Sequence, residues 1–318
     1  MTKLAAVDCG TNSLRLLISD VDPVGRRREI TREMRIVRVG QGVDATHEIN
    51  PEAIERAREV LTDYVARMRF EGVERVRMVA TSAVRDAKNR DDFFAMTEEL
   101  LGQVEPGARA EVISGEEEAQ LSFDGAVQFL KPERGPFCVI DLGGGSTEFV
   151  VGNADGEIFG SHSTQMGCVR LSERIMRADP PTDAETEIAR DYIRERLSEV
   201  RALVPVEKAK TFVGCAGTFT TLSALAQGLE RYDPAAIHGS ELNFDALRVI
   251  TRQLRREDSA TRAHNPVMHQ GRADVIGAGV VIVEEVMAMI EEIAEPRSFV
   301  ISEMDILDGI IGDLRARS

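Results

Sequence analysis

The chain has 318 residues, of which 43% are hydrophobic and 29% charged, and its formal net charge is −15. This length suffices for two domains with buried cores. So acidic a surface disfavours nucleic acids and anionic membranes, which are bound by neutralising phosphates with Lys and Arg. The longest apolar stretch, Ile276–Val283, is too short to span a bilayer. We therefore expect a cytoplasmic protein with no nucleic-acid or membrane partner.

The elements of the first half follow from periodicity and turn signals. They are expected to be strands at Leu4–Val7 and Leu14–Ile18, a helix at Pro51–Met68, strands at Arg75–Ala80 and Ala110–Ile113, and a helix at Glu116–Leu130. Two prolines and a glycine within residues 131–136 then stop the helix and mark a linker.

After this linker the same order of elements begins again. Strands are expected at Phe137–Ile140, Glu148–Val151 and Thr211–Val213, the last leading into a helix. Asp8 and Ser82 are 74 positions apart, and Asp141 and Gly217 are 76 apart. The near-equal spacing favours a duplicated α/β fold with a cleft between the copies over an unrelated α/β alternation. We expect domains at residues 1–127 and 128–318, with the C-terminal helix free to pack back on the first.

The acid-bracketed glycine turn between the first strands of the second half is the strongest functional signal. Consecutive glycines let a backbone approach an anion and turn its N–H groups inward. Asp141 and Glu148 at its ends offer hard oxygen ligands for Mg²⁺ or Mn²⁺. Both flanking segments are strands, which excludes Walker and Rossmann loops. The candidate phosphate contacts here are Gly143, Gly144, Gly145, Ser146 and Thr147.

Three further segments carry candidate anion contacts. The turn after Asp8 offers Thr11, Asn12 and Ser13. The strand-to-helix turn at 214–218 offers free N–H groups at Gly217 and Thr218. Arg85 lies just inside the helix that follows Arg75–Ala80, where it could grip phosphate or be an ordinary surface arginine.

An acidic cluster begins the helix after Ala110–Ile113. Ser114 and Glu117 have capping-box spacing, which explains Glu117 structurally. Glu118 instead shares a line with Ser122 and Gly125, small residues that could border a cleft. A carboxylate there could orient and deprotonate water; spacing alone leaves this role and a structural one equally supported.

Together these motifs resemble the exopolyphosphatase/guanosine pentaphosphate phosphatase family, in its short two-domain bacterial form. The resemblance covers nearly the whole chain and rests on segments 8–13, 80–85, 113–119, 141–148, 166–171 and 217–218. It implies a duplicated actin-like (ribonuclease H-like) fold that splits terminal phosphoanhydrides. It further implies that Glu118 is the catalytic base, that Asp141 and Glu148 bind a divalent metal, and that Arg85 contacts phosphate. A homodimer is compatible with the resemblance.

Two features depart from the longer family members. The chain ends soon after the second domain, without the helical domains that extend a polyphosphate channel in those members. Leu307 also stands where they often have an arginine, so any phosphate contact of that arginine is lost or supplied elsewhere.

The leading hypothesis is an exopolyphosphatase that releases terminal phosphate from inorganic polyphosphate. The alternatives are hydrolysis of the 5′ terminal phosphate of guanosine pentaphosphate and a weakly catalytic protein that senses polyphosphate or alarmones. An ATP-dependent kinase or ATPase is disfavoured, because such relatives usually place their catalytic acids elsewhere than in the Ile-Ser-Gly glutamate run.

Overall fold

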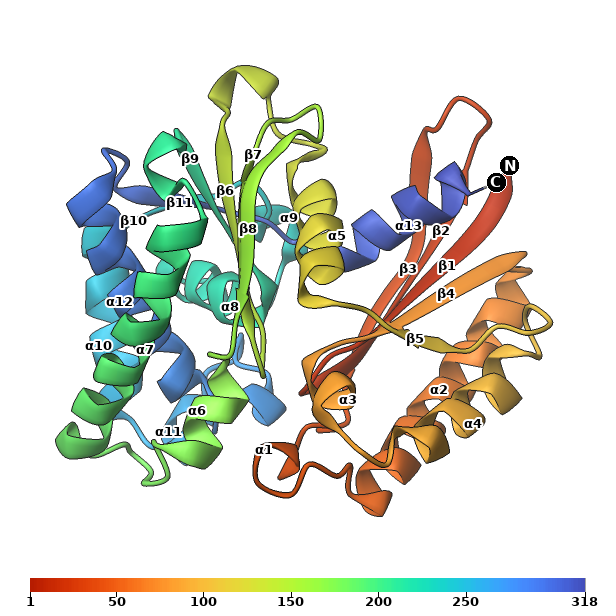
Figure 1. Ribbon diagram of the computed structural model, residues 1–318, viewed down its shortest axis with the longest axis horizontal. Helices are drawn as coiled ribbons and strands as arrows, with labels where there is room; N and C mark the ends of the chain where they lie inside the picture. The colour runs from red at the N-terminus through yellow and green to blue at the C-terminus, as the bar shows by residue number, and fades with distance from the viewer. Residues whose placement is uncertain (318) are drawn as a thin grey trace. The chain divides into compact units, whose positions relative to one another are not determined.

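The computed structural model describes residues 1–317 and divides into two compact units (Figure 1). Unit 1 comprises Met1–Gly125 together with the segment that begins at Ile306, and unit 2 comprises Ala126–Asp305. The division thus falls two residues before the expected one, and the last helix belongs to unit 1. Residues 131–136, the expected linker, lie in unit 2.

Unit 1 is built on a five-stranded sheet of order β3-β2-β1-β4-β5. The strands are β1 (Thr2–Cys9), β2 (Ser13–Val21), β3 (Arg27–Ile36), β4 (Arg75–Ala80) and β5 (Ala110–Val112). β1, β2 and β3 pair antiparallel, whereas β1, β4 and β5 pair parallel.

Helices cover both faces of this sheet. They are α1 (Val43–Thr46), α2 (Pro51–Glu71), α3 (Ser82–Asp86), α4 (Arg90–Leu101), α5 (Gly115–Val127) and α13 (Ile306–Ala316). Because strand side chains alternate between faces, Ala5 and Val7 join the core beneath α2 and α4, while Leu4 and Ala6 join the core beneath α13. Burial on both faces explains the unbroken apolar run of β1.

Unit 2 is built on a six-stranded sheet of order β10-β11-β9-β6-β7-β8. Its strands are β6 (Phe137–Leu142), β7 (Thr147–Gly152), β8 (Ile158–Thr164), β9 (Thr211–Cys215), β10 (Glu241–Asn243) and β11 (Ser298–Ile301). Its helices are α6 (Cys168–Arg174), α7 (Asp183–Leu203), α8 (Ala216–Ala226), α9 (Pro234–Ile237), α10 (Phe244–Arg256), α11 (Ser259–Ala263) and α12 (Ile276–Ile293), with short 3-10 turns at Pro132–Arg134, Val206–Lys208 and Gln270–Arg272. Alternate residues of β6, namely Cys138, Ile140 and Leu142, face a core that includes the apolar side of α12.

The two sheets share one topology. β8-β7-β6-β9-β11 of unit 2 repeats β3-β2-β1-β4-β5 of unit 1, with the same antiparallel and parallel pairings. This confirms the duplicated, actin-like α/β fold. The third strand of each copy, β3 and β8, was not predicted from the sequence. β3 is rich in charged residues and lies at a sheet edge, so no apolar run marks it.

The four cysteines, Cys9, Cys138, Cys168 and Cys215, are buried free thiols. Burial raises the pKa of Cys168 to about 11, so this thiol stays protonated at neutral pH. These positions therefore act as small apolar filler. Within residues 1–317, no helix has the length and apolar character needed to cross a bilayer.

Gly309 lets α13 pack against the backbone of α5. A methyl group at position 309 would lie 2.0 Å from the carbonyl oxygen of Leu121. We expect Gly309→Ala to lower the free energy of unfolding by about 2 kcal/mol, because α13 must move away from its core. Thermal or urea unfolding would measure the change.

Gly312 provides a matched control on the same helix. A methyl group there meets nothing within 4 Å, so Gly312→Ala should raise the free energy of unfolding by about 0.5–1 kcal/mol through helix propensity. Equal stabilisation by both substitutions would contradict the close packing of α13 on α5.

Candidate active site

The glycine loop of unit 2 joins β6 to β7 and is closed by a hydrogen bond from the Gly143 N–H to the Ser146 carbonyl (3.0 Å). Its other carbonyl groups point toward α6. Those of Gly143 and Gly144 accept N–H groups from the first turn of that helix (2.9–3.1 Å), and that of Gly145 accepts Nε of Arg170 (2.8 Å). The carbonyl oxygens, which would repel an anion, are thus bound within the protein.

The N–H groups of the same loop remain available. Among residues 1–317, those of Gly144, Gly145 and Ser146 donate to no protein acceptor. Successive backbone N–H groups of this kind form a concavity suited to phosphate oxygens. The loop therefore has the expected polarity for a phosphate site.

Two carboxylates flank this loop on neighbouring strands. Asp141 is directly opposite Glu148 in the β6–β7 pair, and Glu148 is opposite Ser163 in the β7–β8 pair. Residues so paired present their side chains on one face. Ser163 donates its hydroxyl to Oε1 of Glu148 (2.8 Å), and both carboxylates are buried. Two buried like charges side by side favour a bound cation.

The donor set fits a hard divalent cation. Mg²⁺ is usually held by one or two carboxylates and completes its shell with water and substrate phosphates. In the described part of the chain, no group of three or more His, Cys, Asp or Glu residues could form a closed metal site. Asp141 and Glu148 therefore suit a metal that is shared with a phosphate ligand.

Thr147 differs from its expected role. Its side chain is fully buried, and its hydroxyl donates to the carbonyl of Met166 (2.5 Å). Thr147 begins β7 and so points into the core, where it holds the segment before α6. It stabilises the loop from within instead of offering a hydroxyl to a ligand.

The loop of unit 1 has the same hydrogen-bond pattern. The Gly10 N–H donates to the Ser13 carbonyl (3.0 Å), as Gly143 does to Ser146. The carbonyls of Thr11 and Asn12 accept N–H groups from residues 37–40 (2.9–3.1 Å), the segment that follows β3. The corresponding segment of unit 2 follows β8. Asn12 and Ser13 therefore occupy the positions of Gly145 and Ser146.

The two loops differ in the charge of one flanking residue. Asp8 occupies the position of Asp141, but the residue opposite it in β2 is Arg15, where unit 2 has Glu148. Nε and Nη2 of Arg15 both donate to Oδ2 of Asp8 (2.9 and 2.7 Å). The first carboxylate is thus neutralised by a neighbour, and only the second loop keeps two carboxylates together.

Glu118 lies in the first turn of α5, where Arg85 of α3 contacts it. Nη1 of Arg85 donates to Oε2 of Glu118 (3.1 Å) and to the carbonyl of Ile113 (2.9 Å). Glu118 is 8% exposed. Among residues 1–317, Nε and Nη2 of Arg85 have no protein acceptor, so they remain available for phosphate. The structure thus brings together the two residues that sequence analysis had singled out separately in unit 1.

Glu117, which directly precedes Glu118, anchors the first turn of α5 to β4. Glu117 accepts from the buried guanidinium of Arg77 in β4, and its N–H donates to Ser114 Oγ (3.1 Å). Burial alone would lower the pKa of Arg77, but Glu117, Glu111 and Asp313 outweigh it and raise the pKa. This charged group therefore holds the helical turn that also carries Glu118.

An arginine that was not predicted from the sequence, Arg272 of the 3-10 turn Gln270–Arg272, contacts the first turns of α8. Cys215, at the N-cap, makes no side-chain cap, so the N–H groups of the first turn, including Gly217 and Thr218, have no capping partner. A methyl group at Gly217 would overlap the guanidinium of Arg272, which donates to Thr221 Oγ1 (2.9 Å). No sequence signal links Arg272 to α8, because the two lie far apart along the chain.

Leu307 is 1% exposed and belongs to the apolar core beneath α13. The side chain at this position is therefore a packing residue of unit 1.

Comparisons with known proteins show which sequences and structures this chain is similar to. The model of the Ppx/GppA phosphatase family matches residues 17–314. Exopolyphosphatase 2 of Mycobacterium tuberculosis is 53% identical over 313 residues, which cover 98% of each chain. The crystal structure of an exopolyphosphatase-like protein is 37% identical, with a TM-score of 0.92 over 99% of each chain. The Aquifex aeolicus member of the Ppx/GppA family is 30% identical, with a TM-score of 0.80 over 99% of this chain and 98% of that one.

Proposed function

Since this chain belongs to the Ppx/GppA phosphatase family, we propose that it is an exopolyphosphatase that releases terminal orthophosphate from inorganic polyphosphate. The observation that carries the proposal is the loop of unit 2, whose free N–H groups adjoin the paired carboxylates of Asp141 and Glu148. The N–H groups would bind phosphate oxygens, and a cation held by the two carboxylates would offset the charge of the phosphate. The name of the 53% identical relative supports polyphosphate as the substrate.

The reaction is an in-line displacement at the terminal phosphorus. Water attacks that phosphorus, the bridging P–O bond breaks, and the shortened chain leaves with the bridging oxygen. Glu118 orients the water and accepts its proton. Free donors of Arg85 and the loop N–H groups stabilise the charge of the transferring group. Phosphoryl transfer depends mostly on positioning and electrostatics, which these residues provide.

Asp141 and Glu148 would hold a divalent cation, Mg²⁺ or Mn²⁺. When bound, such an ion offsets the charge of the phosphate chain. Ser163 would fix the orientation of Glu148 through its hydrogen bond. Thr11, Asn12 and Ser13 of unit 1, with Gly217 and Thr218 of unit 2, are proposed as further phosphate contacts.

The metal assignment predicts the effect of Asp141→Asn. Removing one of two negative ligands should raise the Mg²⁺ concentration for half-maximal activity at least about tenfold. Phosphate release during an Mg²⁺ titration would measure this, and calorimetry with Mn²⁺ would measure binding directly. Asp155→Asn, an exposed acid in the turn after β7, is the control. An unchanged metal requirement in Asp141→Asn would refute the assignment.

The substrate is tested by measuring phosphate release, with and without Mg²⁺, from tripolyphosphate, long-chain polyphosphate, guanosine pentaphosphate and ATP. We expect Mg²⁺-dependent release that is greatest from polyphosphate. Faster release from guanosine pentaphosphate would overturn the substrate assignment. Tight polyphosphate binding with no release would identify a sensor instead of an enzyme.

A further inference from the structure

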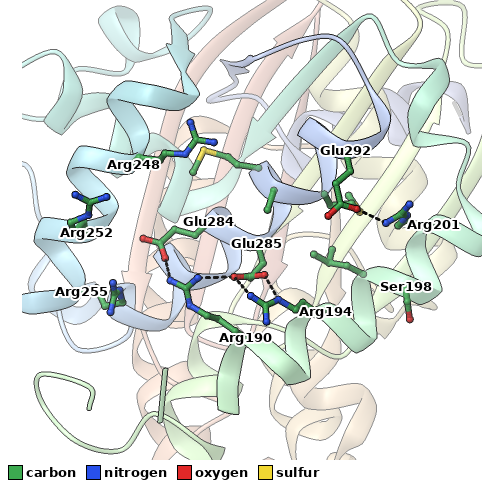
Figure 2. A pocket seen from close by; sticks show the side chains of 14 residues that line it. Arg190, Arg194, Ser198, Arg201, Arg248, Arg252, Arg255, Glu284, Glu285 and Glu292 are labelled. Carbon is green, nitrogen blue, oxygen red and sulfur yellow. Dashed lines mark hydrogen bonds and ion pairs between the residues drawn. The ribbon is translucent and has the colours of Figure 1, made fainter. Parts of the chain in front are cut away.

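A groove with a volume of about 600 Å³ lies in unit 2 among α7, α10 and α12 (Figure 2). None of the residues assigned to catalysis lines it. Six arginines do: Arg190, Arg194 and Arg201 from α7, and Arg248, Arg252 and Arg255 from α10. Only three carboxylates, all from α12, accompany them. A groove so rich in arginine is unexpected in a chain with a net charge of −15.

Most of these arginines are paired with carboxylates of α12. The pairs are Arg190 with Glu284 (2.7 Å) and Glu285 (3.0 Å), Arg194 with Glu285 (2.8 Å), Arg201 with Glu292 (2.8 Å), and Arg248 with Glu291 (2.5 Å). Glu285 is 5% exposed and holds two guanidinium groups, as Figure 2 shows. These ion pairs join α7 and α10 to α12, and we regard them as structural.

Arg252 and Arg255, unlike the other four arginines, form no ion pair with the described residues of α12. Arg252 is exposed and forms no ion pair with any residue of 1–317. Arg255 lies 3.9 Å from the carboxylate of Asp183, a side chain that is fully exposed and therefore screened. Nε of Arg255 is buried without a hydrogen-bond partner. Three residues apart on α10, the two arginines share one face and leave positive charge uncompensated in the groove.

The length of the groove indicates which class of ligand it binds. Arg248 to Arg255 spans about 10 Å along α10, and Arg190 to Arg201 about 16 Å along α7, at 1.5 Å per residue. An open channel between two rows of guanidinium groups suits an extended polyanion better than a single compact group. Guanidinium binds phosphate oxygens in bidentate fashion, with more directional selectivity than an ammonium group.

We propose that this arginine groove binds a stretch of the polyphosphate chain, in addition to the end that is hydrolysed. The inference rests on the proposed function only for the identity of the polyanion. The groove would increase the affinity of this two-domain chain for long polyphosphate. Arg252 and Arg255, whose charges are not balanced by close carboxylates, would make the main contacts.

The test compares the double variant Arg252→Ala/Arg255→Ala with wild type and with Arg256→Ala. Arg256 is an exposed neighbour on α10 that does not line the groove. Equilibrium binding of long-chain polyphosphate to the full-length protein is measured in EDTA, which prevents hydrolysis. The double variant should bind about tenfold more weakly, with a shallower salt dependence, and should lose less affinity for tripolyphosphate. Arg256→Ala should bind like wild type, and Arg252→Lys/Arg255→Lys should recover part of the affinity.

Unchanged affinity in the double variant, or an equal loss in Arg256→Ala, would overturn the proposal. Binding of guanosine tetraphosphate is measured in the same way. If the double variant loses affinity for guanosine tetraphosphate but not for polyphosphate, the groove binds a nucleotide and the proposal is overturned. Failure of the proposed function is distinguishable: a chain that hydrolyses no polyphosphate yet binds it through Arg252 and Arg255 would refute only the enzymatic assignment.

Discussion

Replacing Glu118 with glutamine is expected to lower kcat by about 10²–10⁴-fold while leaving phosphate binding intact. Glutamine keeps the size of the side chain and an oxygen that can accept from Arg85, but it cannot take a proton from water. Because Glu118 contacts Arg85 at 3.1 Å, the geometry of the pair should survive. Initial rates on polyphosphate would give kcat, and equilibrium binding of tripolyphosphate would show that the site is intact.

Glu116→Gln is the matched control for this prediction. Glu116 lies in the same helical turn, is exposed, and has no ion pair among the described residues. It should retain the kcat of the wild type. Full activity of Glu118→Gln would remove Glu118 from the mechanism. An equal loss in both variants would mean that the charge of the turn, and not one base, governs the rate.

Gly167→Ala is expected to reduce kcat/KM about 100-fold while the chain still folds. A methyl group at position 167 would lie 2.3 Å from the carbonyl oxygen of Gly144 and 2.5 Å from the nitrogen of Gly145. The glycine loop would have to move, and a displacement of about 1 Å in a positioning group can cost this factor. Phosphate release would measure the loss, and thermal unfolding would separate it from global destabilisation of about 1–3 kcal/mol.

Cys168→Ala, one residue further along, is the control. It retains the backbone N–H that donates to the Gly143 carbonyl (3.1 Å) and removes only a buried thiol. Its kcat/KM should remain within a few-fold of wild type. Wild-type kinetics in Gly167→Ala would contradict the idea that the position of this loop controls turnover.

Duplication explains why the two loops are built alike and yet differ in charge. Gly40 of unit 1 corresponds to Gly167: a methyl group at Gly40 would lie 2.2 Å from the Thr11 side chain. In both units, the segment after the third strand binds the loop carbonyls and needs a glycine at the point of contact. Where unit 2 has Glu148 opposite Asp141, unit 1 has Arg15 opposite Asp8, so the two loops differ in the charge beside them.

The sequence by itself determined the features that depend on neighbouring residues. A strand, a glycine turn and a returning strand span few positions, so the hairpins at Asp8 and Asp141 were predictable from local pattern. The same holds for the first turn of α5, where Ser114 caps the helix and Glu118 follows it. The spacing of these motifs also predicted the duplication, because each copy keeps its own order of elements.

Only the tertiary structure decided where side chains point and which distant segments meet. Thr147 is a hydroxyl beside a glycine loop in the sequence, yet strand alternation turns it into the core. Arg15 pairs with Asp8, and Arg272 reaches α8, through contacts that no local pattern records. The arginine groove is the clearest case, because its charge balance depends on three helices that are separated along the chain and meet only through packing.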